Sequence, residues 1–241
     1  MDHALEPDLE RLAVLAEPAR RRLYLYVAPR ADAVGRDEAA QAVGVSRALA
    51  AFHLDRLVEE GLLQTEFRRL TGRSGPGAGR PSKLYRRARR ELAVSLPKRS
   101  YELAARLFAT ALDDGTSGPP DPRERLRAAA HEYGKELGAA ARDLATDDRG
   151  GGEVGALTRI LADAGFEPRA EGGSIRLGNC PFHALATSHR NLTCGTNLAL
   201  LDGVLAGLGA TELTATQDPQ PGLCCVHFSP ANEERSTPAM P

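Results

Sequence analysis

The stretch Arg36–Leu63, RDEAAQAVGVSRALAAFHLDRLVEEGLL, constrains the fold more than any other part of the chain. Asp37 predicts the cap of a short helix, because its carboxylate can accept hydrogen bonds from the free amides of a first helical turn. Gly44 predicts a tight turn, and Ser46 predicts the cap of a longer helix that ends before Gly61. Two helices joined by so short a turn predict a helix-turn-helix unit.

The second of these helices has two different faces. Ala50, Leu54 and Leu57 recur at helical spacing and are predicted to lie inward. In a helix-turn-helix protein the opposite face enters the major groove of DNA. That face offers Ser46, Arg47, Ala51 and Arg56. An ordinary helical hairpin fits the same pattern, so the segments that follow decide between the two interpretations.

Two short strands are predicted next, Leu63–Phe67 and Lys83–Arg87, joined by the loop RRLTGRSGPGAGRPS. A basic, glycine-rich loop between two strands, directly after a helix-turn-helix, is typical of a winged helix. Its cations suit phosphates or the minor groove, and Arg80 stands on an extended tip between Gly79 and Pro81. The predicted DNA contacts of this part are Arg68, Arg69, Arg73, Arg80 and Lys83. The alternative is a solvated basic loop without a partner.

The charge is distributed unevenly along the 241 residues. The whole chain has a net charge of −1, but residues 1–100 carry +6 and residues 101–241 carry −7. A basic half followed by an acidic half predicts a polyanion-binding module joined to a domain with another role. No apolar run reaches the roughly 18–20 residues of a membrane span, and the first residues lack the pattern of a signal peptide. We therefore expect a cytoplasmic protein with no membrane partner.

The sequence predicts a mainly α fold with α+β parts, divided into four segments. Residues 1–100 form the winged helix-turn-helix domain, 101–150 a helical linker, 151–228 a small α+β sensor domain, and 229–241 a disordered tail. Within the linker, apolar residues form a narrow stripe that suits the seam of a homodimer. Packing of the same stripe on its own domain is the alternative. The stripe consists of Leu126, Ala130, Tyr133, Leu137, Ala140 and Leu144.

All four cysteines lie in the last 62 residues: Cys180, Cys194, Cys224 and Cys225. In a cytosolic protein such a group indicates metal, iron–sulfur or redox chemistry. Cys180 precedes Pro181, so we expect it at a helix start, where the helix dipole lowers the pKa of a thiol. A final strand predicted over Leu223–Phe228 would place Cys224 and Cys225 on opposite faces.

The predicted metal-binding set is therefore Cys180, Cys194 and Cys224, with a fourth ligand from elsewhere. The candidates for that fourth position are His183, His189, Cys225 and His227. The alternatives are a zinc site, a thiol switch, and buried cysteines beside a small-molecule pocket. We expect no enzyme, because the chain has no phosphate-binding loop and no nucleophile elbow. An enzyme acting through Cys180 and His183 is the alternative of a different class.

Several of these segments together resemble a known family. Arg36–Arg87 resembles ArsR/DeoR-like winged-helix regulators, and NCPFHAL, NLALLDGVLAGLG and CCV are similar to the group containing SufR-type repressors of iron–sulfur cluster biogenesis. The likeness covers roughly residues 9–228. It implies a DNA operator as partner and a [4Fe–4S] cluster on Cys180, Cys194 and Cys224. Unlike the cyanobacterial-type arrangement, this chain has no further Cys between the last two of these and carries Cys225 in addition.

Overall fold

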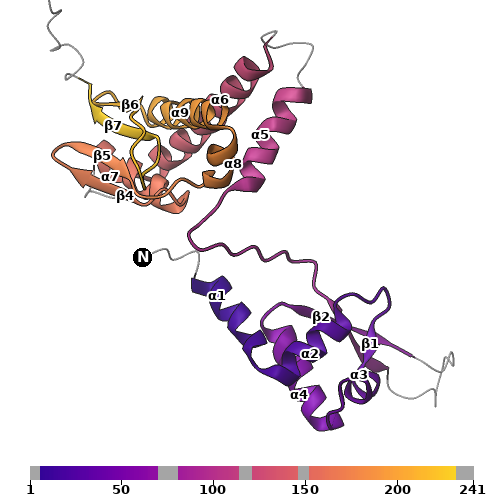
Figure 1. Ribbon diagram of the computed structural model, residues 1–241. Helices are drawn as coiled ribbons and strands as arrows, with labels where there is room; N and C mark the ends of the chain where they lie inside the picture. The colour runs from indigo at the N-terminus through magenta and orange to yellow at the C-terminus, as the bar shows by residue number, and fades with distance from the viewer. Residues whose placement is uncertain (1–5, 70–80, 114–120, 146–151, 232–241) are drawn as a thin grey trace, which may run out of the picture. The chain divides into compact units, whose positions relative to one another are not determined.

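The computed structural model describes residues 6–69, 81–113, 121–145 and 152–231, and the chain divides into two compact units, Met1–Val94 and Ser95–Pro241. Each unit has its own hydrophobic core. Both combine helices with a small antiparallel sheet (Figure 1), so the expected α+β character is confirmed. None of the helices in the described ranges is long and apolar enough to cross a membrane.

The N-terminal unit consists of helices on a three-stranded sheet with the strand order β1-β3-β2. Strand β3 pairs antiparallel with both neighbours, and Thr65 of β2 lies opposite Tyr85. The core contains Leu23, Ala50, Leu54, Leu57 and Tyr85, all fully buried. The elements are α1 (Glu6–Ala13), a 3-10 turn (Val14–Ala16), α2 (Pro18–Val27), β1 (Val34–Gly35), α3 (Arg36–Val43), α4 (Arg47–Glu59), β2 (Leu63–Arg68) and β3 (Ser82–Arg87).

The turn between α3 and α4 contains the predicted glycine, and α4 begins with the predicted serine cap. Gly44 adopts the left-handed conformation, with φ 71°, which a residue without Cβ reaches at little cost. The Ser46 hydroxyl accepts a hydrogen bond from the Leu49 amide at 3.2 Å and so caps α4. The prediction for Asp37 is wrong, because α3 begins at Arg36 after Gly35, which leaves Asp37 inside the first turn.

The C-terminal unit packs its helices on a four-stranded antiparallel sheet with the order β4-β5-β7-β6. Helix α9 is largely buried and contacts α6, α7, α8 and the sheet. The elements are α5 (Tyr101–Asp113), α6 (Pro122–Ala145), α7 (Gly152–Asp163), β4 (Pro168–Glu171), β5 (Ser174–Leu177), α8 (His183–Ser188), α9 (Arg190–Leu208), β6 (Leu213–Gln217) and β7 (Val226–Pro230).

Helices α6 and α9 lie side by side at the distance that glycine allows (Figure 1). A Cβ on Gly134 would lie 2.0 Å from the Leu200 carbonyl oxygen, and one on Gly203 would lie 2.1 Å from that of His131. Gly138 and Gly207 face backbone atoms in the same way. The two backbones therefore touch along two turns.

This packing uses much of the apolar stripe that the sequence offered for a dimer. Leu126 and Ala130 are buried in the core of their own unit, and Tyr133 and Leu137 pack against it. Ala140 is exposed, and the Leu144 side chain lies outside the described residues. Because α5 and α6 contribute to this core, both helices belong to the C-terminal unit.

The segment predicted as a disordered tail begins inside the sheet. Ser229 and Pro230 belong to β7, and the Ala231 amide donates to the Glu212 carbonyl at 2.9 Å. The strand extends this far because it pairs with β6 as far as Leu213. The remainder of that prediction, residues 232–241, lies outside the described residues.

Candidate functional site

The exposed face of α4 carries the predicted DNA contacts, but its cations have acidic partners within the protein. Arg47 lies 2.5 Å from Asp37, and both side chains are largely exposed. Arg56 contacts Glu59 at 3.0 Å and Glu60 at 2.5 Å. Exposed ion pairs of this kind contribute little free energy, so a phosphate or a base edge can displace them.

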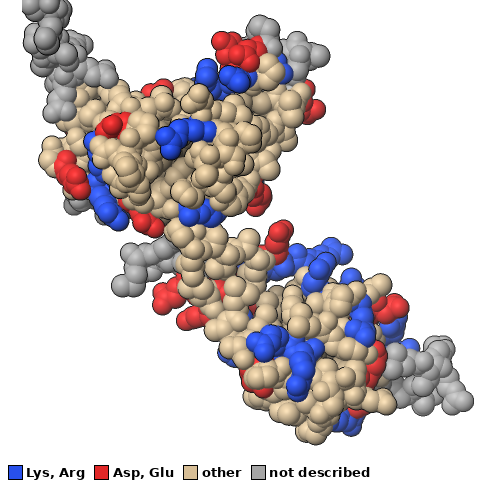
Figure 2. Space-filling model, in the orientation of Figure 1, with Lys and Arg blue, Asp and Glu red and all other residues tan. Residues whose placement is uncertain are grey.

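The predicted contacts of the strand hairpin differ from one another. Arg69 is exposed and makes no ion pair with a described residue, whereas Arg68 lies 3.8 Å from Glu66. Lys83 contacts the Asp55 carboxylate of α4 at 2.6 Å, so it holds β3 against that helix. Arg73 and Arg80 lie outside the described residues. Figure 2 shows Lys and Arg side chains over the visible face of the N-terminal unit, several of them beside Asp and Glu.

Asp55 is the acceptor at the centre of this contact. The Tyr85 hydroxyl also donates to it, at 2.7 Å. Burial raises the pKa of Asp55, but the hydrogen bonds from Lys83 and Tyr85 outweigh burial and leave that pKa below its ordinary value. The same contact, added to burial, raises the pKa of Tyr85.

Two neighbouring rings on α4 were not among the predicted contacts. His53 is buried between α4 and α2, where its Nδ1 accepts a hydrogen bond from Arg20 at 3.3 Å and its Nε2 lies 3.3 Å from the Glu17 carboxylate. Phe52 is 63% exposed, and its ring centre lies 5.3 Å from that of His53. A helical wheel centred on Ala50, Leu54 and Leu57 would have placed Phe52 outward.

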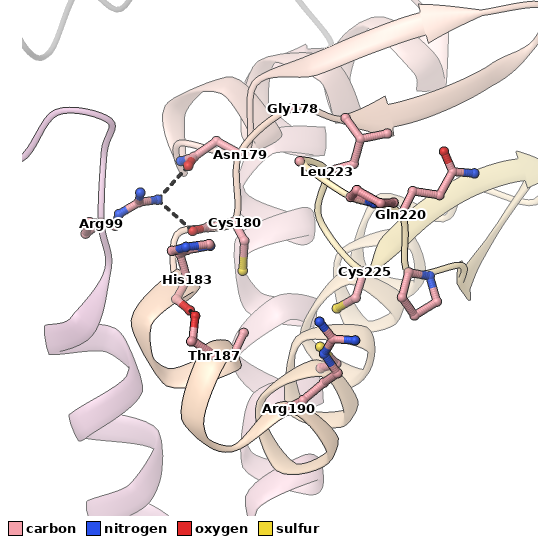
Figure 3. A pocket seen from close by; sticks show the side chains of 15 residues that line it. Arg99, Gly178, Asn179, Cys180, His183, Thr187, Arg190, Gln220, Leu223 and Cys225 are labelled. Carbon is pink, nitrogen blue, oxygen red and sulfur yellow. Dashed lines mark hydrogen bonds between the residues drawn. The ribbon is translucent and has the colours of Figure 1, made fainter.

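In the C-terminal unit, three of the four cysteines line one pocket of about 580 Å³. Figure 3 shows the sulfur atoms of Cys180 and Cys225 directed into it, with the Arg190 side chain beside Cys225. Cys194 also lines the pocket, at the start of α9. The lining contains arginine and histidine but no carboxylate, so the pocket favours an anionic or thiolate-bound occupant.

The fourth cysteine joins the other sulfur atoms from behind the pocket wall. Cys224 is buried, and the thiols of Cys180 and Cys225 lie close enough to it to shift its pKa. Cys225 in turn contacts the Cys194 thiol. The Asn197 side-chain amide donates to the Cys224 sulfur at 3.3 Å. The structure therefore brings all four sulfur atoms together.

The expected placement of Cys224 and Cys225 within a regular strand is wrong, because the strand begins later than predicted. Strand β7 starts at Val226, so strict alternation of side chains does not apply to the two cysteines before it. The Cys224 amide donates to the Leu177 carbonyl, and the Cys225 carbonyl accepts from the Asp218 amide, each at 2.9 Å. These bonds fix both residues in an irregular segment.

The pKa values of the thiols also differ from the prediction. Helix α8 begins at His183, three residues after Cys180, so its dipole does not govern that thiol. The hydrogen bond with Cys224, followed by burial, raises the pKa of Cys180. Burial raises the pKa of Cys194 as well. For Cys224 the contact with Cys180 lowers the pKa, but Cys225 and burial raise it more, to about 11.

Of the four candidates for a fourth ligand, the structure brings two to the pocket. Cys225 and His183 are part of its lining. His189 is exposed at the junction of α8 and α9 and is not part of the lining. His227 lies on β7 beside the Thr216 hydroxyl, and burial lowers its pKa. Position alone therefore favours Cys225 or His183.

The donor set fits a metal that prefers sulfur. Thiolates are the usual ligands of iron–sulfur clusters and of zinc in structural sites, whereas carboxylate sites favour harder cations. Within the described ranges, no group of three His, Cys, Asp or Glu side chains has the arrangement of a site for a single ion. Thiols beside an open pocket are nevertheless the type of donor that a cluster would take.

The segment around Cys180 also holds the chain just before α5. Arg99 donates to the Asn179 side chain at 2.5 Å and to the Cys180 carbonyl at 2.8 Å (Figure 3). Asn179 donates to the Lys98 carbonyl at 3.0 Å, and the Ser100 amide donates to the Pro181 carbonyl at 3.1 Å. Residues 98–100, which lead back toward the N-terminal unit, are thus bound directly to the cysteine site.

Comparison with known proteins adds no relative to this description. No family model, curated protein or solved structure matches the chain.

Proposed function

We propose that the chain is a cytoplasmic, homodimeric transcription regulator that acts as a repressor. The N-terminal unit is a winged helix-turn-helix that binds a two-fold DNA operator, and the C-terminal unit senses iron–sulfur cluster or redox status. The grouping of the four cysteines carries this proposal: three of them line one open pocket and Cys224 lies beside them, so that their thiols can act together as ligands.

The DNA-binding part is supported by local geometry. A short helix, a left-handed glycine turn and a serine-capped helix precede the antiparallel pair β2 and β3, and the loop between those strands carries the predicted wing cations. This order is that of a winged helix-turn-helix. A homodimer is proposed because such proteins read the two halves of an operator with two copies.

In the sensing unit, Cys180, Cys194 and Cys225 line the pocket and Cys224 lies directly behind it, so these four would hold a cluster. When bound, a cluster supplies a redox-sensitive cross-link between the segments that carry its ligands. The residues of the chain itself transmit the change. A shift of the Cys180 backbone alters the hydrogen bond that its carbonyl accepts from Arg99. The position of residues 98–100 would change with it. The position of that segment biases two states of the DNA-binding unit.

The test is the content and spectrum of protein purified without oxygen. A broad absorption near 400 nm with about four iron and four sulfide per chain supports the cluster. Separate Cys→Ser changes at the four positions then identify the ligands, with Ala186→Ser, a substitution in the same pocket lining, as control. Loss of iron on any single Cys change, together with altered operator affinity on cluster removal, is expected. Iron-free protein that cannot be reconstituted would refute the cluster.

A thiol switch is the second candidate, favoured by the contact between Cys180 and Cys224. Their two thiols would lose two protons and two electrons to a peroxide, which is reduced to water while the sulfur–sulfur bond forms. Mass spectrometry after peroxide treatment would show a loss of two hydrogen masses, reversible by a dithiol. Zinc on the same cysteines, or a small molecule in the pocket, gives neither that loss nor the spectrum of a cluster.

A further inference from the structure

We propose that Phe52 reads thymine methyl groups in the operator and is a specificity-determining residue of helix α4. This inference rests on the proposed DNA-binding function and deepens it, because it names the chemical group on the DNA that the helix recognises. It arises from the exposed face of α4, where an aromatic ring stands in the place at which a DNA-reading helix presents its contacts.

Phe52 lies at the middle of the outward face. The buried residues Ala50, Leu54 and Leu57 define the opposite side of the helix, and Phe52 is 63% exposed. One turn before it stands Ala48, whose methyl group is too short to cover the ring. The ring is therefore the most prominent apolar group on this surface.

The Phe52 ring also contacts the ring of the next residue, which restricts its orientation. Its neighbour His53 is buried and hydrogen bonded to Arg20, and the two ring centres are 5.3 Å apart with the planes tilted by 59°. Aromatic pairs at this distance attract each other. An oriented ring loses less freedom on binding than a mobile side chain does, which favours a contact with one defined group.

The polar groups one turn further along are already engaged within the protein. Arg56 is paired with Glu59 and Glu60, and Asp55 accepts from Lys83 and Tyr85. Phe52 is therefore the exposed apolar group at the middle of this face of the helix. In the major groove, the matching apolar group is the C5-methyl of thymine. A lipid surface or a second protein would also cover an apolar ring, but the arginines of this unit favour a polyanion.

The experiment replaces thymidine by deoxyuridine, which removes only the methyl group. A duplex is first selected from random-sequence DNA with the full-length protein, and each thymidine is then substituted in turn. We expect one or two symmetric positions at which wild-type affinity falls about fourfold per methyl group, the equivalent of the ~0.8 kcal/mol of one buried methylene-sized group. Phe52→Ala should bind the unmodified duplex more weakly and be indifferent to deoxyuridine at those positions.

Leu25→Ala is the matched control, since Leu25 is 62% exposed on α2 of the same unit. It should retain the wild-type response to deoxyuridine. Equal sensitivity of Phe52→Ala and the wild type, or a wild type indifferent to every substitution, would overturn the assignment while leaving DNA binding intact. If the protein selects no sequence from the random pool, the operator-binding function fails as well, and the two failures are thereby distinguished.

Discussion

Substitution of Gly134 by alanine tests the close contact between the backbones of α6 and α9. The new methyl carbon would lie 2.0 Å from the Leu200 carbonyl oxygen and 3.0 Å from the Val204 amide nitrogen. Ordinary contact begins at 3.4 Å, so the helices would have to separate by on the order of 1 Å, since a backbone oxygen cannot turn away as a flexible side chain can.

The expected cost follows from two opposing effects. Overpacking of a well-packed core costs about 1–3 kcal/mol, and contact with backbone belongs at the upper end of that range. Alanine has a higher helix propensity than glycine, which stabilises the helix by about 1 kcal/mol. The net loss is about 2 kcal/mol. Separation also weakens the contacts of Leu200, Leu201 and Val204, which are buried beside the crossing.

Thermal unfolding followed by far-ultraviolet circular dichroism measures this loss. A destabilisation of about 2 kcal/mol lowers the Tm of a unit of this size by about 4–8 °C. Gly155→Ala is the control, because Gly155 lies within α7 of the same unit and a Cβ there meets nothing within 4 Å. It should leave the Tm unchanged or raise it. An unchanged Tm for Gly134→Ala would refute the close crossing.

Three further predictions concern the DNA-binding unit and the cysteine site. Arg47→Ala should weaken binding to a selected operator and reduce discrimination between bases, whereas Arg80→Ala should weaken binding to all sequences and reduce the salt dependence of binding. Fluorescence anisotropy over a salt series distinguishes these two effects. Wild-type affinity in both variants would contradict the proposed DNA interface. The lowered pKa of Asp55 means that its charge stabilises the fold above the ordinary pKa of 3.8 and that this stability is lost as the pH falls through the lower folded value. Asp55→Asn should therefore unfold at lower urea concentration than the wild type at pH 6 but not at pH 2, and a difference that does not vary with pH would exclude the charge as its cause. Arg99→Met should speed amide hydrogen exchange at Ser100, whereas Arg106→Met, which removes only an exposed pair with Glu102, should not; equal exchange in the two variants would argue against the hold on this segment.

The elements of the N-terminal unit were predictable because their signals are local. Ser46 caps α4 as expected, and the predicted strand Leu63–Phe67 differs from β2 by one residue. The second strand begins one residue earlier than predicted, at Ser82. Capping hydroxyls and turn glycines act within a few residues of their own position, so a single sequence displays them.

The function of α6 was not predictable from its apolar residues alone. The stripe containing Leu126 and Ala130 fits a dimer seam as well as it fits a core, since both require the same spacing. The glycines held the additional information. Gly134 and Gly138 lie four residues apart on α6, as Gly203 and Gly207 do on α9, and this spacing places each pair on one helical face. Which partner approaches that face depends on the fold of the whole unit.

The cysteine site shows the same dependence on distant parts of the chain. The thiols of Cys224 and Cys225 lie close enough to interact, and both residues precede the strand, which begins at Val226. The two cysteines follow Pro219, Pro221 and Gly222. Because such residues end regular secondary structure, the sequence also allowed the prediction of an irregular segment in place of a longer strand. The positions of Cys180 and Cys194 beside this pair could not be predicted from the sequence, because they depend on where α9 packs against the sheet. A ligand set inferred from spacing along a strand therefore gave Cys225 only as one of four candidates for the fourth position, whereas the folded chain places it in the lining of the pocket.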